Sequence, residues 1–315
     1  MRLDRVDVPG EHEARERTWT VVRAAFAERE PAPVRRRRLV PAIAVAALAA
    51  AVAAALTPPG RAVVDRVREA LGVETAEQAL FSLPTAGRLL VVSDSGAWLV
   101  SRDGSKRRLG DYRVAACSPF GRFVAAAREG ELAALEPDGD VRWTLARPGI
   151  AAVDWGGTPT DTRIAYLSGG TLRVVAGDGT GDRALGPADR FRWLPAPGHR
   201  LEVLSGGRTT VVDADTGAVV PAEPPPAGRG VRVRREGGTS QLLVDGRVRF
   251  EGSGTFRDPA VSPDGRWLAF VWAEADQLVF VTASGPRRIE ATANLTAQFD
   301  GFATPRLAGW CPAPE

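Results

Sequence analysis

The sequence has very few of the side chains from which metal sites and nucleophilic sites are commonly built. It contains two cysteines, two histidines and a single lysine, Lys106, among 41 basic residues. Two cysteines and two histidines are too few for a Cys/His zinc cage, and His12 and His199 lie in separate parts of the chain. The sequence also lacks a Gly-x-Ser-x-Gly motif, so a serine hydrolase is not expected. We therefore expect no metal, no cofactor and no catalytic residue.

The distribution of charge excludes a broad class of partners for most of the chain. Residues 1–59 carry 10 arginines and seven acidic residues, which leaves 31 basic and 31 acidic side chains for residues 60–315. A neutral domain lacks the overall positive field that a phosphate backbone requires, so nucleic-acid binding is not expected. The near-absence of lysine, together with the high alanine and glycine content, is typical of a G+C-rich bacterial genome.

One long apolar run lies near the N-terminus. Leu39 to Leu56 is an uncharged stretch of 18 residues. As a helix it would be about 27 Å long, close to the thickness of a hydrocarbon core. The four arginines of 35–38 orient such a span with its N-terminus in the cytoplasm. We predict a single-pass cell-membrane protein with a cytoplasmic segment over 1–38, a transmembrane helix over 39–57 and an extracytoplasmic remainder. The alternative is a cleaved secretory signal ending at the alanines of 53–55, which would also export the rest of the chain.

Helical patterns flank this run on both sides. Within a predicted amphipathic helix at about 11–30, Trp19, Val22 and Phe26 share one apolar face. Two interpretations of this face stay open. It rests on the inner membrane surface or on a second copy, or it docks a cytoplasmic partner such as a transcription regulator. Residues 58–86 are predicted to form a helical stalk or linker.

From about residue 87 to residue 315 the pattern changes to short apolar runs separated by Gly, Asp, Pro and Ser turns. Runs such as Leu89–Val92, Leu172–Val175 and Leu278–Val281 predict β-strands, and no long helix is expected. Similar turn-then-strand patterns begin at 117, 155 and 193, so they lie 38 residues apart. A period near 40 with about four strands in each repeat is typical of a propeller blade.

The clearest repeat is Ser262-Pro263-Asp264-Gly265, which the apolar strand from Trp267 follows directly. It resembles the WD-repeat-like blade of TolB-type propellers, whose inner strand ends in a W-S-P-D-G turn. The resemblance covers about 87–315 and implies an all-β, six-bladed β-propeller. The segment at the C-terminus has an inner-strand motif with no strands after it, and we expect it to close the ring by completing the first blade. The aromatic position of the blade is matched by Trp155, Trp193 and Trp310.

Two further patterns bear on possible sites. The acidic turns at 136–140, 178–182 and 213–217 do not complete the ligand pattern of a calcium loop, and Asp-Gly pairs are common in hairpins, so we interpret them as turns. Cys117 and Cys311 both follow the inner-strand pattern. Two buried free thiols are the simpler interpretation, and the alternative is a disulfide in an oxidising compartment, which would lock the closure.

These patterns predict a non-enzymatic propeller that is held outside the membrane and binds a protein partner or a small ligand at one face. A sensor or regulator with a cytoplasmic docking helix is one version of this function. Two alternatives belong to other classes. One is an exported enzyme that uses carboxylates lining the propeller channel, and the other is an envelope scaffold, as the resemblance to TolB-type propellers implies.

Overall fold

The computed structural model describes residues 82–158, 160–194, 198–221 and 230–313, which all belong to one compact unit. The predicted transmembrane helix over 39–57 and the predicted docking face of Trp19, Val22 and Phe26 lie outside these residues. Nearly all of the predicted stalk over 58–86 lies outside them as well. In the part of the chain that the structure describes, no helix is long and apolar enough to cross a membrane.

The described residues form six antiparallel sheets, five with four strands and one with three. We number the sheets 1 to 6 in chain order and give their strands from the inside outward. Sheet 1 contains β23 (Arg306–Cys311), β1 (Arg88–Ser93), β2 (Gly96–Val100) and β3 (Lys106–Gly110). Sheet 2 contains β4 (Val114–Cys117), β5 (Val124–Arg128), β6 (Glu131–Leu135) and β7 (Val141–Ala146). Sheet 3 contains β8 (Ile150–Thr158), β9 (Asp161–Ser168), β10 (Thr171–Ala176) and β11 (Arg183–Pro187).

The remaining sheets follow the same order. Sheet 4 contains β12 (Arg190–Trp193), β13 (Arg200–Ser205), β14 (Arg208–Asp213) and β15 (Val219–Val220). Sheet 5 contains β16 (Val231–Glu236), β17 (Thr239–Val244) and β18 (Arg247–Ser253). Sheet 6 contains β19 (Phe256–Val261), β20 (Trp267–Trp272), β21 (Gln277–Thr282) and β22 (Ile289–Thr292). A short helix, α4 (Leu295–Gln298), connects sheet 6 to β23.

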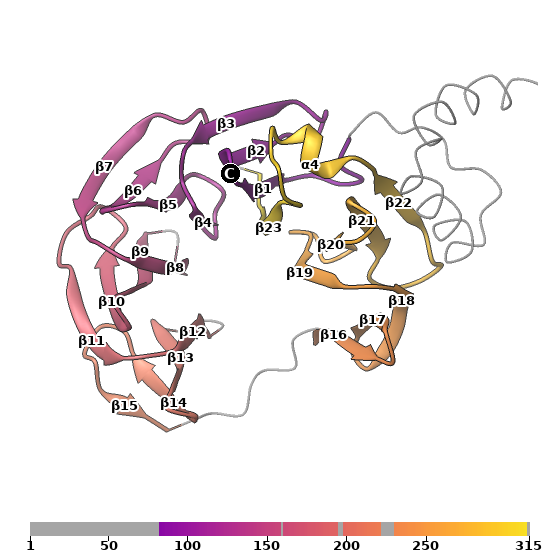
Figure 1. Cartoon of the computed structure of the whole chain (residues 1–315). Helices are drawn as coiled ribbons and strands as arrows, with labels where there is room; N and C mark the ends of the chain where they lie inside the picture. Colours follow the sequence, from indigo (N-terminus) through magenta and orange to yellow (C-terminus); the bar gives the residue numbers. More distant parts are fainter. Residues whose placement is uncertain (1–81, 159, 195–197, 222–229, 314–315) are drawn as a thin grey trace, which may run out of the picture. The chain divides into compact units, whose positions relative to one another are not determined.

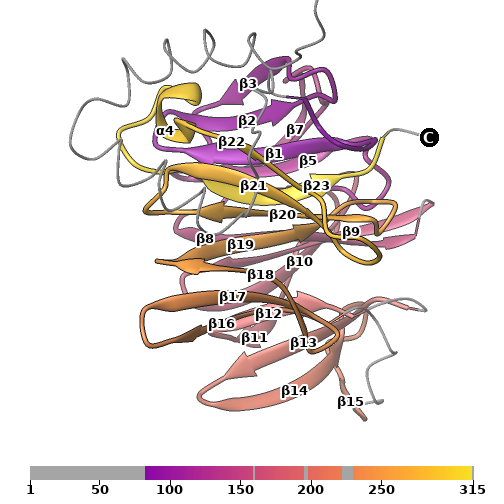
Figure 2. The same ribbon diagram turned by 90° about the vertical axis from the view of Figure 1, so that its right-hand side faces the viewer.

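The sheets are arranged around a common axis, as the blades of a β-propeller are (Figure 1). The strands β4, β8, β12, β19 and β23 lie nearest the centre, and the last strand of each sheet lies at the rim. In the side view the strands run roughly along this axis (Figure 2). The all-β expectation is therefore confirmed for the described residues. Although β23 is the last strand in the sequence, it pairs with β1 from Arg88↔Cys311 to Val92↔Arg306, with one register shift.

Apolar side chains fill the spaces between neighbouring sheets. The strand β20 is buried at all six positions because sheet 5 covers one of its faces and sheet 1 covers the other. This explains why its sequence reads as a continuous apolar run rather than as an alternating one. Clusters of this kind join sheets 1 and 2, 2 and 3, 3 and 4, 5 and 6, and 6 and 1. The hydrophobic effect thus holds the sheets against one another face to face.

Sheet 5 differs from the others in its number of strands, since it has three within the described ranges. Its two hairpins close as hairpins of the other sheets do. The N–H of Asp245 after β17 donates to Gly230 before β16, and the N–H of Gly254 after β18 donates to Gly238 before β17.

Candidate functional site

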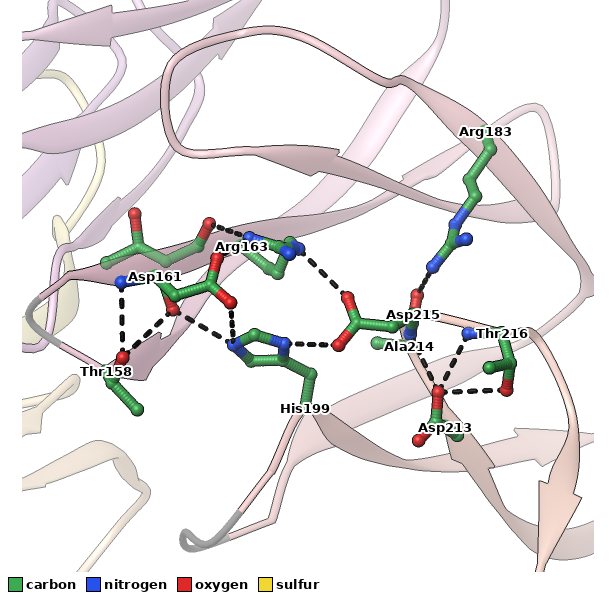
Figure 3. Close-up of polar contacts among 10 residues, drawn as sticks. Thr158, Asp161, Arg163, Arg183, His199, Asp213, Ala214, Asp215 and Thr216 are labelled. Carbon is green, nitrogen blue, oxygen red and sulfur yellow. Dashed lines mark hydrogen bonds and ion pairs between the residues drawn. The ribbon is translucent and has the colours of Figure 1, made fainter.

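His199 lies at the centre of a group of hydrogen-bonded side chains between sheets 3 and 4 (Figure 3). His199 precedes β13 and is buried, with 7% of its surface exposed. Its Nδ1 lies 2.6 Å from Oδ2 of Asp215, in the turn between β14 and β15. Its Nε2 lies 2.9 Å from the main-chain oxygen of Asp161, at the start of β9. The imidazole therefore ties a hairpin of sheet 3 to a turn of sheet 4.

Arg163 supplies a positive charge next to the two carboxylates of this group. Nε of Arg163 lies 3.1 Å from Oδ1 of Asp215, and its guanidinium also forms an ion pair with Asp161. Burial raises the pKa of Asp215, but the hydrogen bond from His199 and the charges of His199 and Arg163 outweigh burial, so the net shift is downward. Both ring nitrogens of His199 face acceptors that hold them in place. We call this group of Asp161, Arg163, His199 and Asp215 the clamp.

Two glycines of β8 make room for this clamp. Gly157 has φ +109°, and a side-chain Cβ there would lie 2.4 Å from the main-chain oxygen of Asp161 and 3.1 Å from Nε2 of His199. At Gly156 a Cβ would lie 2.4 Å from the ring of Trp193. Trp193 in turn meets His199 edge-on, with ring centroids 6.5 Å apart. Glycine is required here because two strands and two rings approach one backbone closely.

A cavity of about 350 Å³ opens beside the clamp, with Arg163, Arg183 and Asp215 in its lining. A second cavity, of about 380 Å³, is lined by Arg247 and Arg249 of sheet 5 and by the turn after β21. Arg183 donates to the main-chain oxygen of Ala214, and Arg249 donates to that of Thr282. In both cavities an arginine of an outer strand thus contacts the backbone of the next sheet.

In two of the acidic turns one carboxylate is bound within the turn, whereas Asp182 and Asp215 of the same turns pair with residues outside it. Oδ1 of Asp178 accepts from the N–H and the hydroxyl of Thr180, and Oδ1 of Asp213 accepts from both groups of Thr216. Hydrogen bonds of this kind stabilise tight turns. No group of three or more His, Cys, Asp or Glu side chains in the described ranges is arranged to hold a metal ion.

The three tryptophans assigned to the repeat lie at equivalent ends of inner strands. Trp155 is buried in β8 and stacks on Phe123 of sheet 2 with ring centroids 6.1 Å apart. Trp310 of β23 meets Phe280 of sheet 6 at 5.7 Å. Together with Trp193, they pack between neighbouring sheets. The structure thus places all three in interfaces and brings none of them to the clamp except Trp193.

The turn Ser262-Pro263-Asp264-Gly265 is held by its own side chains. Oγ of Ser262 accepts from the N–H of Trp267 at 2.9 Å and donates to Oδ1 of Asp264, which also accepts from the N–H of Arg266 at 3.0 Å. Gly265 has φ +67°, which favours glycine. The turn at Ser118 repeats the first contact, since Oγ of Ser118 accepts from the N–H of Phe123 at 3.0 Å. This turn is a structural device that starts the second strand of a blade.

Cys117 and Cys311 are joined by a disulfide with a Cα–Cα distance of 5.4 Å. The two residues end the neighbouring inner strands β4 and β23, and their separation fits the range in which cysteines can be bridged. Of the two interpretations left open by the sequence, the structure has the disulfide. The bond fastens the C-terminal strand to sheet 2, while its backbone pairing fastens it to sheet 1.

Sequence reasoning missed two polar groups. It noted His199 only as lying apart from His12, and no pattern in the sequence indicated its partners in two other hairpins. It also missed Asp182, whose carboxylate accepts from Tyr166 and pairs with Arg147 and Arg173. The residues of both groups come from separate strands and turns, so a single sequence carries no spacing signal for them.

Comparisons with known proteins identify no family for this chain. No family model and no curated protein matches the chain. TolB from Acinetobacter baumannii is similar with 14% identity and a TM-score of 0.48, over 72% of this chain and 67% of that one. The β-propeller domain of Swd1 from Myceliophteria thermophila is similar with 11% identity and a TM-score of 0.42, over 67% and 89%. Hydrazine synthase from Kuenenia stuttgartiensis also matches, with 11% identity and a TM-score of 0.38, over 66% and 80%.

Proposed function

We propose that this chain is a single-pass membrane protein that presents a six-bladed β-propeller outside the cytoplasm. In this proposal the ring is closed through β23, and the propeller binds a protein partner or a small ligand without catalysing a reaction. The observation that carries the proposal is the disulfide between Cys117 and Cys311. Disulfides persist in oxidising compartments and are rare in the cytosol. The apolar run over 39–56, with four arginines before it, supplies the membrane anchor.

The state of the buried polar groups supports binding over catalysis. Both ring nitrogens of His199 are held by Asp161 and Asp215. The carboxylate of Asp182 is held by Tyr166 and two arginines. Catalytic acids and bases need a position from which they can exchange a proton with a substrate. Groups that are engaged in this way act instead to hold neighbouring strands together.

Protease accessibility of the full chain in bacterial spheroplasts tests this topology. We expect external protease to digest a tag at the C-terminus and to leave a membrane-bound fragment with an N-terminal tag. The unfolded, unreduced protein should also take up no thiol-alkylating reagent, because both cysteines are bonded. Protection of both tags would contradict export, and loss of the N-terminal tag before protease treatment would contradict a retained anchor. Alkylation of both thiols would contradict the disulfide on which the proposal rests.

A further inference from the structure

Sheets 4 and 5 each expose one polar face. All five apolar clusters formed by the described residues join other pairs of sheets, and none joins sheet 4 to sheet 5. Leu201 and Val203 of β13 pack toward sheet 3, and Leu242 and Val244 of β17 pack toward sheet 6. Since sheets 4 and 5 are neighbours around the axis (Figure 1), their opposite faces are turned toward the space between them.

On sheet 4, this face presents arginines of the inner strand β12. Arg190 and Arg192 are both exposed and lie two residues apart, so they point to the same side of the strand. Arg192 makes a bidentate ion pair with Glu202 of β13 at 2.7 and 2.8 Å. Arg190 lies opposite Leu204 in the register and has no acidic partner among the described residues. Its guanidinium is available to a ligand.

Sheet 5 repeats this arrangement on β16. Arg234 donates to Oε1 of Gln241 at 3.0 Å, and Nε2 of Gln241 donates to Glu251 at 2.6 Å, which forms a polar row across three strands. Arg232 is exposed, lies opposite Leu243 and has no acidic partner in the ranges that the structure covers. Each face therefore pairs one available arginine with one neighbouring leucine. Val248 of β18, 46% exposed, adds to the apolar part.

We propose that these two faces form a binding surface for an extended acidic segment of a partner protein. Carboxylates of the segment would meet the guanidinium groups of Arg190 and Arg232, which present donors in the fork geometry that matches a carboxylate. Apolar side chains of the same segment would cover Leu204 and Leu243. The ligand that fits is an extended peptide in which two acidic residues alternate with two apolar residues, because alternate residues of a strand point to opposite sides and each side then carries both kinds of side chain.

The apolar neighbours favour a peptide over a nucleic acid. A surface that binds a phosphate backbone combines many basic groups along a groove, whereas here Glu202 and Glu251 neutralise part of the positive charge. A peptide that carries acidic and apolar side chains on both of its sides can use both the guanidinium groups and the leucines. This assignment rests on the proposed binding role of the propeller and adds the place and the chemistry of the partner.

Fluorescence anisotropy with the full-length protein in detergent tests the assignment. The probe is a labelled eight-residue peptide with two glutamates and two valines repeated once, and its comparison peptide has lysine in place of glutamate. We expect saturable binding of the glutamate peptide, weakening with added salt, and no binding of the lysine peptide. The double variant Arg190→Glu/Arg232→Glu should lower the affinity about tenfold or more, because it places like charges against the ligand.

The matched control makes the same change of charge at exposed turn residues of other sheets. Arg122→Glu/Arg287→Glu should bind the glutamate peptide as the wild type does, and circular dichroism should show equal folding of both variants. Absence of saturable binding to the wild type would overturn the proposal, as would an equal loss in the control variant. Equal binding of an oligothymidylate of the same charge would also overturn it in favour of a general anion surface. None of these results affects the protease accessibility of the two tags. The proposed membrane topology is therefore tested separately from the peptide-binding surface.

Discussion

At the scale of single residues, two partly buried carboxylates of sheet 3 have pKa values shifted in opposite directions. Asp154 of β8 accepts the main-chain N–H of Trp155 at 2.9 Å. Burial raises the pKa of Asp154 to about 6, although hydrogen bonds from the backbone of Trp155 and Trp193 lower it in part. The pKa of Asp182 is lowered instead. Burial raises it, but hydrogen bonds from Arg173, Tyr166 and Arg147 outweigh that effect.

We predict that Asp154→Asn stabilises the protein at neutral pH. The folded state binds the proton of Asp154 more tightly than the unfolded state, so the wild type loses stability as the pH rises from 3.8 to about 6. This shift corresponds to at most about 3 kcal/mol, and asparagine avoids the cost while it keeps an acceptor oxygen. Urea unfolding should show a gain of about 1–3 kcal/mol at pH 7.5 and almost none near pH 4.

Asp182→Asn is the control, and we expect it to change the free energy of unfolding in the opposite direction. Its folded pKa is depressed, so its contribution to stability is present above the ordinary value of 3.8 and is lost as the pH falls through the folded value. This variant should be less stable than the wild type at pH 7.5, and the difference should shrink in acid. A stabilising effect of Asp182→Asn, or a loss of stability in Asp154→Asn at pH 7.5, would contradict this account of the two carboxylates.

At the scale of strands and turns, a side chain of the outer strand repeatedly donates to the next sheet. Nε1 of Trp143 in β7 lies 3.0 Å from the main-chain oxygen of Gly177 in sheet 3. Arg107 of β3 reaches Asp138 of sheet 2 at 3.2 Å, and Arg249 of β18 reaches Thr282 of sheet 6 at 3.0 Å. These bonds join the outer strands of three sheets to the sheets that follow them.

The turn under Trp143 gives a prediction with an internal control. A Cβ at Gly179 would lie 2.8 Å from the ring of Trp143, whereas a Cβ at Gly181 would meet no atom within 4 Å. Both glycines have positive φ, +88° and +67°, so alanine at either one adopts a disfavoured backbone that costs roughly 1–2 kcal/mol. We expect Gly179→Ala to lose about 1–3 kcal/mol more than Gly181→Ala in urea unfolding, because only the former collides with the ring.

The collision can be removed to check its cause. In a Trp143→Ala background the difference between the two alanine variants should disappear. A difference that persists would show that the backbone conformation, and not the ring contact, sets the cost.

The strands were the part of the fold that the sequence could predict. The runs Leu89–Val92 and Leu278–Val281 lie within β1 and β21, because apolar runs between turn residues report burial directly. What a single sequence could not predict is which strands meet. The partners of His199 come from two other hairpins, and such contacts are set only when the sheets pack.

At the scale of the whole molecule, the last strand in the sequence belongs to the first sheet. Pairing of β23 with β1 places the two ends of the described chain side by side, and the disulfide links β23 to β4 as well. Sheets 1 and 2 therefore both depend on a strand that is separated from them by most of the chain. A cross-link between residues 194 positions apart restricts the unfolded chain strongly, which is the main source of stabilisation by a disulfide.

We predict that Cys117→Ala/Cys311→Ala lowers the free energy of unfolding by about 2–5 kcal/mol, as loss of a native disulfide typically does. The physical reason is the larger conformational freedom of the unfolded chain once the loop is open. Urea unfolding of the full-length protein, with and without a reducing agent, measures the effect. The reducing agent should bring the wild type close to the double variant and leave the double variant unchanged. Equal unfolding midpoints of the oxidised wild type and the variant would mean that backbone pairing and apolar packing alone hold β23 in place.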